Sequence, residues 1–251
     1  MKVLMCDQGT PGWLDARCGI ATASEFNNIL TPKQGTLSTS WKSYAALLIS
    51  ERLIGTTDPW RFDGETADMR RGRAYEDEAC DFFAFTHGVE LQKVGFCIHD
   101  NGLWGCSPDR LIGEDSGLEI KAPAPKTQIR WVYEGVLPDD HKNQCHGGMI
   151  VTGRDSWWFM SYCEGCPSLE IEVKRDDWTR RLEDALGEFN KRFDKMLAVI
   201  MEKRMATIDA KIAMKGDQLA DRDRSLVPPS GQWGNGDADP FGPGEYEPQL
   251  F

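Results

Sequence analysis

Residues 106–123 read CSPDRLIGEDSGLEIKAP, a pattern typical of two β-strands joined by a turn. Apolar residues dominate both ends, and the glycine-bounded GEDSG in the middle has the composition of a hairpin turn. Side chains two positions apart on a strand share a face, so Glu119 and Lys121 point to the same side of the sheet. The turn brings Asp109 beside them. We therefore predict that two carboxylates and one ammonium converge at the end of a sheet.

Such a set of side chains suits chemistry at a phosphate group. Mg²⁺ prefers hard oxygen ligands and is commonly held by one or two carboxylates together with substrate phosphate. Two such ions can clamp the attacking water and the leaving oxygen of a phosphodiester, while a lysine orients that water or neutralises charge. The alternative is an exposed Glu119–Lys121 ion pair, worth under ~1 kcal/mol. Pro108-Asp109 upstream, the turn and the apolar flanks favour the functional interpretation.

The remaining apolar periodicities alternate between strand and helix repeats, which predicts an α/β fold with a central mixed β-sheet flanked by helices. We expect strands at residues 89–98, 103–112, 118–122, 156–162 and 169–173. We expect helices that begin at Thr22–Glu25 and that span residues 41–54, 66–86, 125–133 and 139–151, followed by a long helix. The apolar stripe of this long helix, expected in the core, comprises Leu182, Leu186, Phe189, Phe193, Met196, Ile200, Met205 and Ile208.

The C-terminal part of the chain differs in composition from the rest. The segments PPSG at residues 228–231 and DPFGPG at residues 239–244 interrupt every periodicity, and few apolar residues surround them. We therefore predict one domain over residues 1–213 and an acidic, Gly/Pro-rich disordered tail over residues 214–251.

Overall composition restricts the class of protein. The 251 residues include 29 basic and 40 acidic ones, and the net charge of −11 argues against a protein that coats DNA, though not against an enzyme that acts on it. Runs of ~18 apolar residues and a secretory signal are absent from the sequence, so we expect no membrane partner. The eight scattered cysteines favour reduced thiols in the cytoplasm. We interpret Cys163-x2-Cys166 as a turn rather than a metal or cluster site.

Four motifs resemble those of one known family, and they follow one another along the chain in the order that the family shows. Pro108-Asp109 with Glu119-Ile120-Lys121 resembles the PD-(D/E)xK nuclease signature. The other three motifs resemble those of the phage lambda-type exonucleases (YqaJ-like viral recombinases), and they lie at Trp13–Ser24, Gly72–Phe83 and Asn143–Thr152. The resemblance extends over residues 8–200 and implies a restriction-endonuclease-like nuclease core within the mixed sheet.

The resemblance also implies roles for individual residues. The catalytic residues that it implies are Asp109, Glu119, Lys121, Gln144 and Glu76. Asp109, Glu119 and Glu76 would bind the metal together with the backbone carbonyl of Ile120, and two Mg²⁺ ions are implied, with Mn²⁺ able to substitute. The residues alone leave alternatives open, because Glu76 could pair with Arg73 on its own helix and Gln144 could bond to backbone.

Three further residues are implied to contact DNA. Arg17 would bind the 5′-terminal phosphate together with Ser24. Lys33 occupies the position of a basic residue that enters the duplex end. Taken alone, Arg17 could equally lie over Trp13 with its guanidinium in solvent.

As a function, the resemblance implies Mg²⁺-dependent 5′→3′ digestion of one strand of linear double-stranded DNA from 5′-phosphorylated ends. The product would carry 3′ overhangs for phage-type recombination by strand annealing. A homotrimer, a single-strand annealing protein as partner and a cytoplasmic location in a bacterial host are implied as well. The alternatives are a PD-(D/E)xK endonuclease, a Cas4-like nuclease, or an inactive adaptor that binds DNA ends.

Overall fold

The computed structural model describes residues 1–57 and 67–225, and the side chains of residues 67–69 and 216–225 are not described. The helices are α1 (Pro11–Arg17), the 3₁₀ helix η1 (Ala23–Asn28), α2 (Trp41–Ile54), α3 (Ala67–His87), α4 (Pro125–Glu134), α5 (Asp139–Thr152) and α6 (Asp177–Ser225). The strands are β1 (Lys2–Leu4), β2 (Ala21–Thr22), β3 (Leu91–Gln92), β4 (Phe96–Ile98), β5 (Trp104–Cys106), β6 (Arg110–Ile112), β7 (Ser116–Lys121), β8 (Ser156–Ser161) and β9 (Leu169–Lys174). Two compact units divide the chain, residues 1–198 and residues 199–251.

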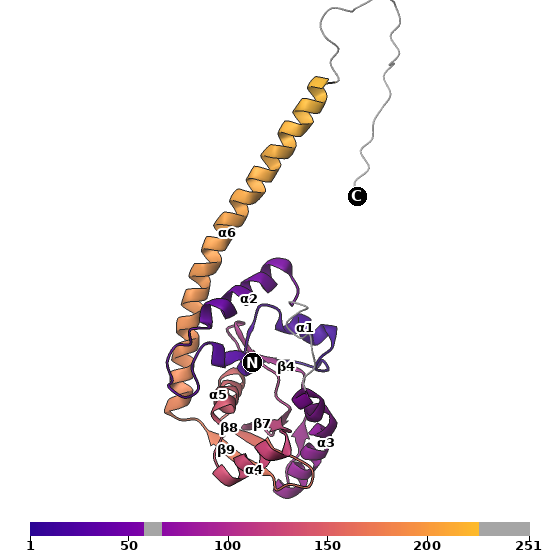
Figure 1. Cartoon of the computed structure of the whole chain (residues 1–251), viewed down its shortest axis with the longest axis vertical. Coiled ribbons are helices and arrows are strands. Elements are labelled where there is room, and N and C mark those ends of the chain that lie inside the picture. The colour runs from indigo at the N-terminus through magenta and orange to yellow at the C-terminus, as the bar shows by residue number, and fades with distance from the viewer. Residues whose placement is uncertain (58–66, 226–251) are drawn as a thin grey trace, which may run out of the picture. The chain divides into compact units, whose positions relative to one another are not determined.

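The first unit contains two mixed sheets rather than the single sheet expected. One has the order β1-β4-β5-β2 and the other the order β3-β6-β7-β8-β9. The strand expected over 103–112 is divided between them, because Pro108 has no N–H to donate to a strand ladder. The strand expected over 89–98 is also divided between the two sheets, as β3 and β4. The α/β class is as predicted, with helices beside both sheets (Figure 1).

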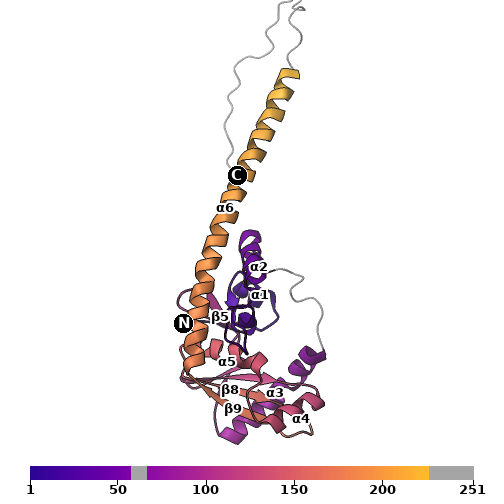
Figure 2. The same ribbon diagram turned by 60° about the vertical axis from the view of Figure 1, so that its left-hand side comes forward.

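Strand β7 presents different chemistry on its two faces. Leu118 and Ile120 pack with Ala79 and Phe83 of α3 in a buried apolar cluster. The side chain of Glu119 lies on the opposite face, where it accepts a hydrogen bond from α5. Helices α3 and α5 therefore cover opposite faces of the five-stranded sheet, as Figure 2 shows. This alternation is what aims the predicted polar set away from the core.

Two glycines let α5 approach its neighbours closely. A Cβ atom at Gly148 would lie 2.7 Å from the ring of Trp157, and one at Gly147 would lie 2.6 Å from the ring of Phe26. Substitution of either glycine would therefore push α5 away from β8 or η1. The glycines cost helix propensity, but they set the depth at which α5 lies on the sheet.

Two expectations about helices are wrong in detail. The helix expected to begin at Thr22–Glu25 is a six-residue 3₁₀ helix, and the Thr22 side chain makes no capping bond to it. The boundary expected at residue 213 falls inside α6, which continues through Gly216 to Ser225 and ends before the first proline of the tail, Pro228. Residues 226–251 of the expected tail lie outside the described residues.

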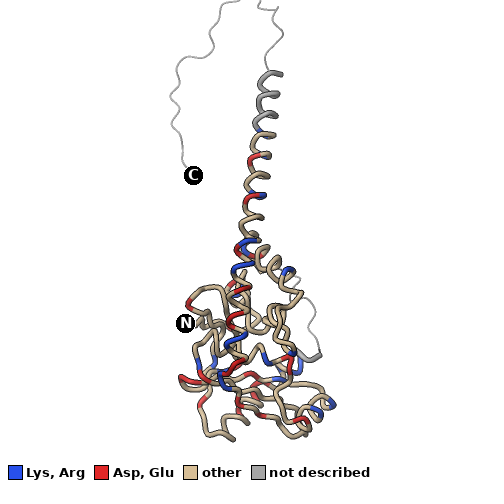
Figure 3. Tube along the Cα trace, turned by 90° about the vertical axis from the view of Figure 1, so that its left-hand side faces the viewer, with Lys and Arg blue, Asp and Glu red and all other residues tan. Residues whose placement is uncertain are grey.

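The apolar stripe of α6 is core only in its first half. The buried members are Leu182, Leu186, Phe189 and Phe193. Met205 and Ile208, which belong to the second unit, are exposed, so the expectation that the whole stripe is core is wrong. Figure 3 shows that acidic and basic residues occur along the described length of α6. In the described part of the chain, no helix combines the length and apolar character that crossing a membrane requires.

The contact between α5 and α6 predicts a loss of stability in acid. His146 is buried, its Nδ1 lies 2.8 Å from Thr179 Oγ1, and burial lowers its pKa from 6.5 to about 4 although Asp176 opposes the shift. The unfolded chain then binds more protons between these values, so the free energy of unfolding falls as the pH drops from 6.5 to 4, by up to about 1.4 kcal/mol per pH unit. Denaturant unfolding across this range should show a flatter pH dependence for His146→Gln. If His146→Gln kept the full pH dependence of the free energy of unfolding, His146 would not be its source. His99→Gln is the matched control.

Candidate active site

Asp109, Glu119 and Lys121 meet as the sequence predicts. Lys121 Nζ donates a hydrogen bond to Glu119 Oε1 within β7. Asp109 lies in the break between β5 and β6, where its Oδ2 accepts a 2.6 Å hydrogen bond from the backbone N–H of Ile120. The Asp109 N–H in turn donates to the Leu118 carbonyl over 3.2 Å. The Pro108 break therefore turns the Asp109 side chain toward β7 instead of leaving it on a regular strand.

The electrostatics of this cluster favour an additional cation. Burial and the Glu119 carboxylate raise the pKa of Asp109 well above its usual range. Burial also raises the pKa of Glu119, against the opposing effect of Lys121. Burial by itself would lower the pKa of Lys121, but Glu119 and Asp109 outweigh it and raise that pKa. A half-buried and a buried carboxylate thus share one ammonium, and any further positive charge would relieve their mutual repulsion.

Gln144 reaches the same carboxylate from α5. Its Nε2 donates a 2.7 Å hydrogen bond to Glu119 Oε1, the atom that also accepts from Lys121. Glu119 is 3% exposed, so these two donors hold its carboxylate in one orientation. The Gln144 amide group therefore binds a carboxylate side chain and not the backbone group considered as the alternative.

Glu76 lies beside the cluster but is bound to an arginine. Arg110 Nη1 donates to Glu76 Oε1 over 2.7 Å, and Arg110 Nη2 donates to Asp77 over 2.9 Å. Arg110 Nη1 also donates to the backbone carbonyl of Asp109 over 2.6 Å. Glu76 therefore pairs with Arg110, and Arg110 ties α3 to the strand break that carries Asp109.

Arg17 is buried, contrary to the alternative of a guanidinium in solvent. It is 5% exposed, and its guanidinium carbon lies 4.2 Å from the centre of the Trp13 ring. Its Nη1 and Nη2 donate long hydrogen bonds of 3.4 Å to Ser107 Oγ and Thr22 Oγ1. Ser107 also accepts a 2.9 Å bond from Trp13 Nε1. Stacking on Trp13 and the two hydroxyl contacts thus fix the orientation of the guanidinium.

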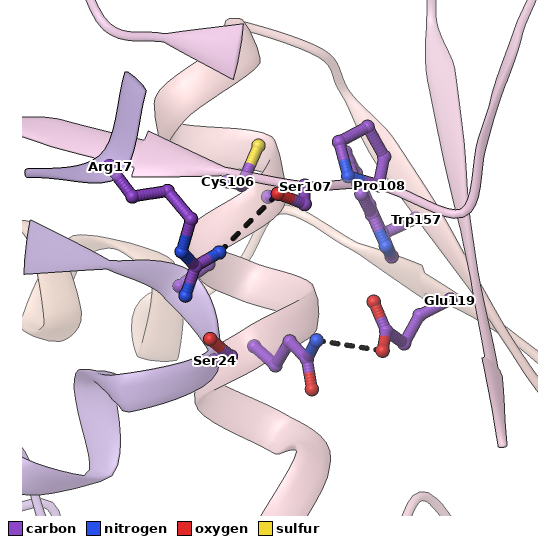
Figure 4. Close-up of a pocket in the computed structure, with 10 residues that line it drawn as sticks. Arg17, Ser24, Cys106, Ser107, Pro108, Glu119 and Trp157 are labelled. Carbon is purple, nitrogen blue, oxygen red and sulfur yellow. Dashed lines mark hydrogen bonds between the residues drawn. The ribbon is translucent and has the colours of Figure 1, made fainter. Parts of the chain in front are cut away.

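One pocket is lined both by Arg17 and by Glu119 of the carboxylate cluster. Arg17, Ser24 and Ser107 line it at one end and Glu119 lines it at the other (Figure 4). Gln144, which is bonded to Glu119, lines it as well. The walls between them are made by apolar or backbone surface from Ala23, Cys106, Pro108, Gly148 and Trp157. Arg17 and Glu119 therefore face the same cavity.

Lys33 is the predicted residue that the structure does not bring to the site. It is exposed in the turn between Thr31 and Thr36 and is not among the residues that line the pocket. The turn is closed by a hydrogen bond from the Thr31 N–H to the Thr36 carbonyl. The number of residues between Arg17 and Lys33 could not predict where this turn lies in the fold.

The donor set fits a hard divalent cation. Among the side chains that the structure describes, in residues 1–57 and 70–215, no three from His, Cys, Asp or Glu are grouped closely enough to hold a metal ion. The available oxygens are the half-buried carboxylate of Asp109, the buried carboxylate of Glu119 and the backbone carbonyl of Ile120, which are the type of donor that Mg²⁺ prefers. Glu76 would have to release Arg110 to add a third carboxylate. Cys163 and Cys166 lie in a turn closed by the Cys166 N–H and the Cys163 carbonyl.

Sequence reasoning missed Arg110, Ser107 and Trp157. Arg110 directly follows Asp109, so its place in the motif was visible, but its partners on α3 were not. Ser107 orients Arg17 from ninety positions away in the sequence. Trp157 forms a wall of the pocket because β8 pairs with β7, and a parallel pairing leaves no local signal in the sequence.

Solved structures of exonucleases are similar to this chain. An alkaline exonuclease from Laribacter hongkongensis (LHK-Exo) is 28% identical, covers 77% of this chain and 97% of its own, and superposes with a TM-score of 0.68. The complex of LHK-Exo with dAMP gives the same values. A phage-related exonuclease from Haemophilus somnus 129PT is 13% identical over 72% of this chain and 96% of its own, with a TM-score of 0.53, and supports the fold alone. A search of curated proteins by sequence finds no match.

The family model for the YqaJ-like viral recombinase domain matches residues 12–155, more than half of the chain. This range contains the whole Asp109–Glu119–Lys121 cluster, Gln144 and the Arg17 end of the pocket. Together with the exonuclease relatives, it indicates a nuclease with a role in phage recombination. The chain therefore belongs to the YqaJ-like viral recombinase family.

Proposed function

We propose that this protein is a Mg²⁺-dependent exonuclease that digests the 5′-ended strand of linear duplex DNA and leaves 3′ overhangs. The observation that carries the proposal is the continuous pocket from Arg17 and Ser24 to Glu119 and Gln144. A guanidinium at one end suits a terminal phosphate, which it binds through charge-assisted hydrogen bonds. Glu119 at the other end belongs to the cluster with Asp109 and Lys121, and such a set of carboxylates and an ammonium suits hydrolysis of the adjacent phosphodiester.

Each residue would have a distinct task. Arg17 and Ser24 would bind the 5′-phosphate and so set the polarity of digestion. Asp109, Glu119 and the Ile120 carbonyl would hold Mg²⁺, which when bound supplies activation of the attacking water and charge neutralisation. Lys121 would orient that water and donate to the phosphate oxygens. Gln144 would keep Glu119 in its orientation, as its 2.7 Å hydrogen bond does in the free protein.

The relative LHK-Exo supports the assignment of substrate. It was crystallised with dAMP, a deoxynucleoside monophosphate of the kind that exonucleolytic digestion releases. With a net charge of −11, the protein is not expected to stay on DNA through a strongly basic surface. We therefore also propose a homotrimeric ring, which would retain DNA by enclosing it, a single-strand annealing protein as partner, and action in the cytoplasm of a bacterial host.

Dependence on a free DNA end tests the proposed function. With Mg²⁺ present, linear duplex should be degraded to mononucleotides and a shortened strand with an intact 3′ end, whereas closed circular duplex should remain intact. Chelation with EDTA should stop the reaction. Fluorescent labels on each 5′ and 3′ end give the polarity directly. Cleavage of closed circles at a comparable rate would indicate an endonuclease instead, and binding of ends without any cleavage would indicate an inactive adaptor.

A further inference from the structure

The second half of α6 carries an exposed apolar seam. Met201, Met205, Ile208 and Ile212 follow one another at spacings of four, three and four, which is the repeat of a coiled coil. Their exposed fractions are 39%, 53%, 39% and 64%. We call these four residues the α6 seam. They all belong to the second compact unit and lie beyond residue 155, where the match to the family model ends.

An exposed seam of this kind indicates an unfilled contact. A solitary helix gains most of its stability from packing an apolar face, and this part of α6 buries none of the four seam residues. Spacings of four and three keep the seam on one side of the helix over two heptads, so a single partner helix lying alongside could cover it. The next seam position, Lys215, is polar and limits the apolar contact to this stretch.

The charges beside the seam show what kind of helix fits it. Glu202 and Asp209 lie along one edge, and Arg204 and Lys211 lie along the other. None of the four has an oppositely charged residue three or four positions away in the sequence, the spacing at which ion pairs form within one helix. These charges are therefore not arranged to stabilise the helix that carries them.

The same charges match a second copy of this helix in one direction only. In a parallel pair, the basic edge of each helix faces the acidic edge of the other, and Arg204 approaches Asp209 of the partner subunit. In an antiparallel pair, basic edges would face each other and acidic edges would do the same. We propose that the α6 seam packs against the α6 seam of a second copy of this chain, as a short parallel coiled coil in register. In the proposed homotrimer each helix would meet the helices of the other copies in this way.

Disulfide trapping in the full-length chain tests the contact. In a parallel pair in register, position 208 of one helix meets position 208 of the other, whereas position 210 lies on the outer face. After mild oxidation, Ile208→Cys should give several-fold more covalent dimer on a non-reducing gel than Ala210→Cys or the unaltered chain, which reports background from the native cysteines. Equal yields from the two variants, or no dimer from Ile208→Cys, would overturn the proposal and leave the seam to another partner.

Charge reversal tests the direction of pairing. In the Ile208→Cys background, Arg204→Glu and Asp209→Arg should each lower the dimer yield about three- to tenfold, because each places like charges across the seam. Combining the two substitutions should restore the yield. The two positions are five residues apart and do not face each other within one helix, so restoration reports contact between copies. A double variant as poor as the single ones would exclude the parallel arrangement.

Discussion

Lys121→Ala should lower cleavage of linear duplex in saturating Mg²⁺ by at least about 100-fold, the usual contribution of a positioned acid–base group. The reason is that its ammonium is the only cation bound to Glu119 among the contacts described here. Asp109→Ala should cause a similar loss by a different route, because it removes a carboxylate from the proposed metal site. Calorimetric titration should separate the two, with Mg²⁺ affinity reduced for Asp109→Ala and retained for Lys121→Ala.

Folding needs its own control, because Lys121 neutralises a buried carboxylate. Removing one partner of a buried ion pair can lower the free energy of unfolding by roughly 3–5 kcal/mol. The pair of substitutions Glu119→Gln and Lys121→Met removes both charges and should restore the melting temperature without restoring cleavage. Lys174→Ala, on the exposed edge strand β9, is the matched lysine control and should keep full activity. Near-normal cleavage by Lys121→Ala would refute the assignment of this cluster as the active site.

Arg17→Ala should reduce cleavage of 5′-phosphorylated duplex roughly 10- to 150-fold, the range expected for loss of a charge-assisted contact of ~1.5–3 kcal/mol. Cleavage of 5′-hydroxyl duplex should fall much less, so the difference between the two substrates should narrow. The physical basis is the guanidinium that Trp13, Ser107 and Thr22 hold at one end of the pocket. Single-turnover rates on the two substrates measure the effect.

A conservative variant distinguishes phosphate binding from a structural role of Arg17. Arg17→Lys keeps the charge but loses the planar fork that can donate two hydrogen bonds to one phosphate, so it should recover only part of the preference for 5′-phosphate. Because η1 is a 3₁₀ helix of only six residues, its dipole is small, and the preference should depend mainly on the Arg17 side chain. Equal losses on both substrates would assign Arg17 to folding or general DNA binding.

Local patterns in the sequence predicted most of the elements and the centre of the site. The alternation in GLEIK places Glu119 and Lys121 on one face because side-chain direction on a strand depends only on the backbone. Helices α2, α4 and α5 begin and end within two residues of their expected bounds, since their apolar spacing and their closing glycines are local signals. The loop position of Lys33 and the partner of Glu76 depend on nonlocal contacts and were not predicted.

By itself, the sequence determined the α/β class, the convergence of Asp109, Glu119 and Lys121, and a long final helix, because each follows from short-range geometry. The tertiary structure alone decided that Pro108 divides one expected strand between two sheets, that Arg110 binds Glu76, and that Arg17 and Gln144 share a pocket. It also decided that the stripe of α6 leaves the core after its first half. These features depend on which distant segments pack together, and burial of apolar surface is set by the whole chain rather than by any one repeat.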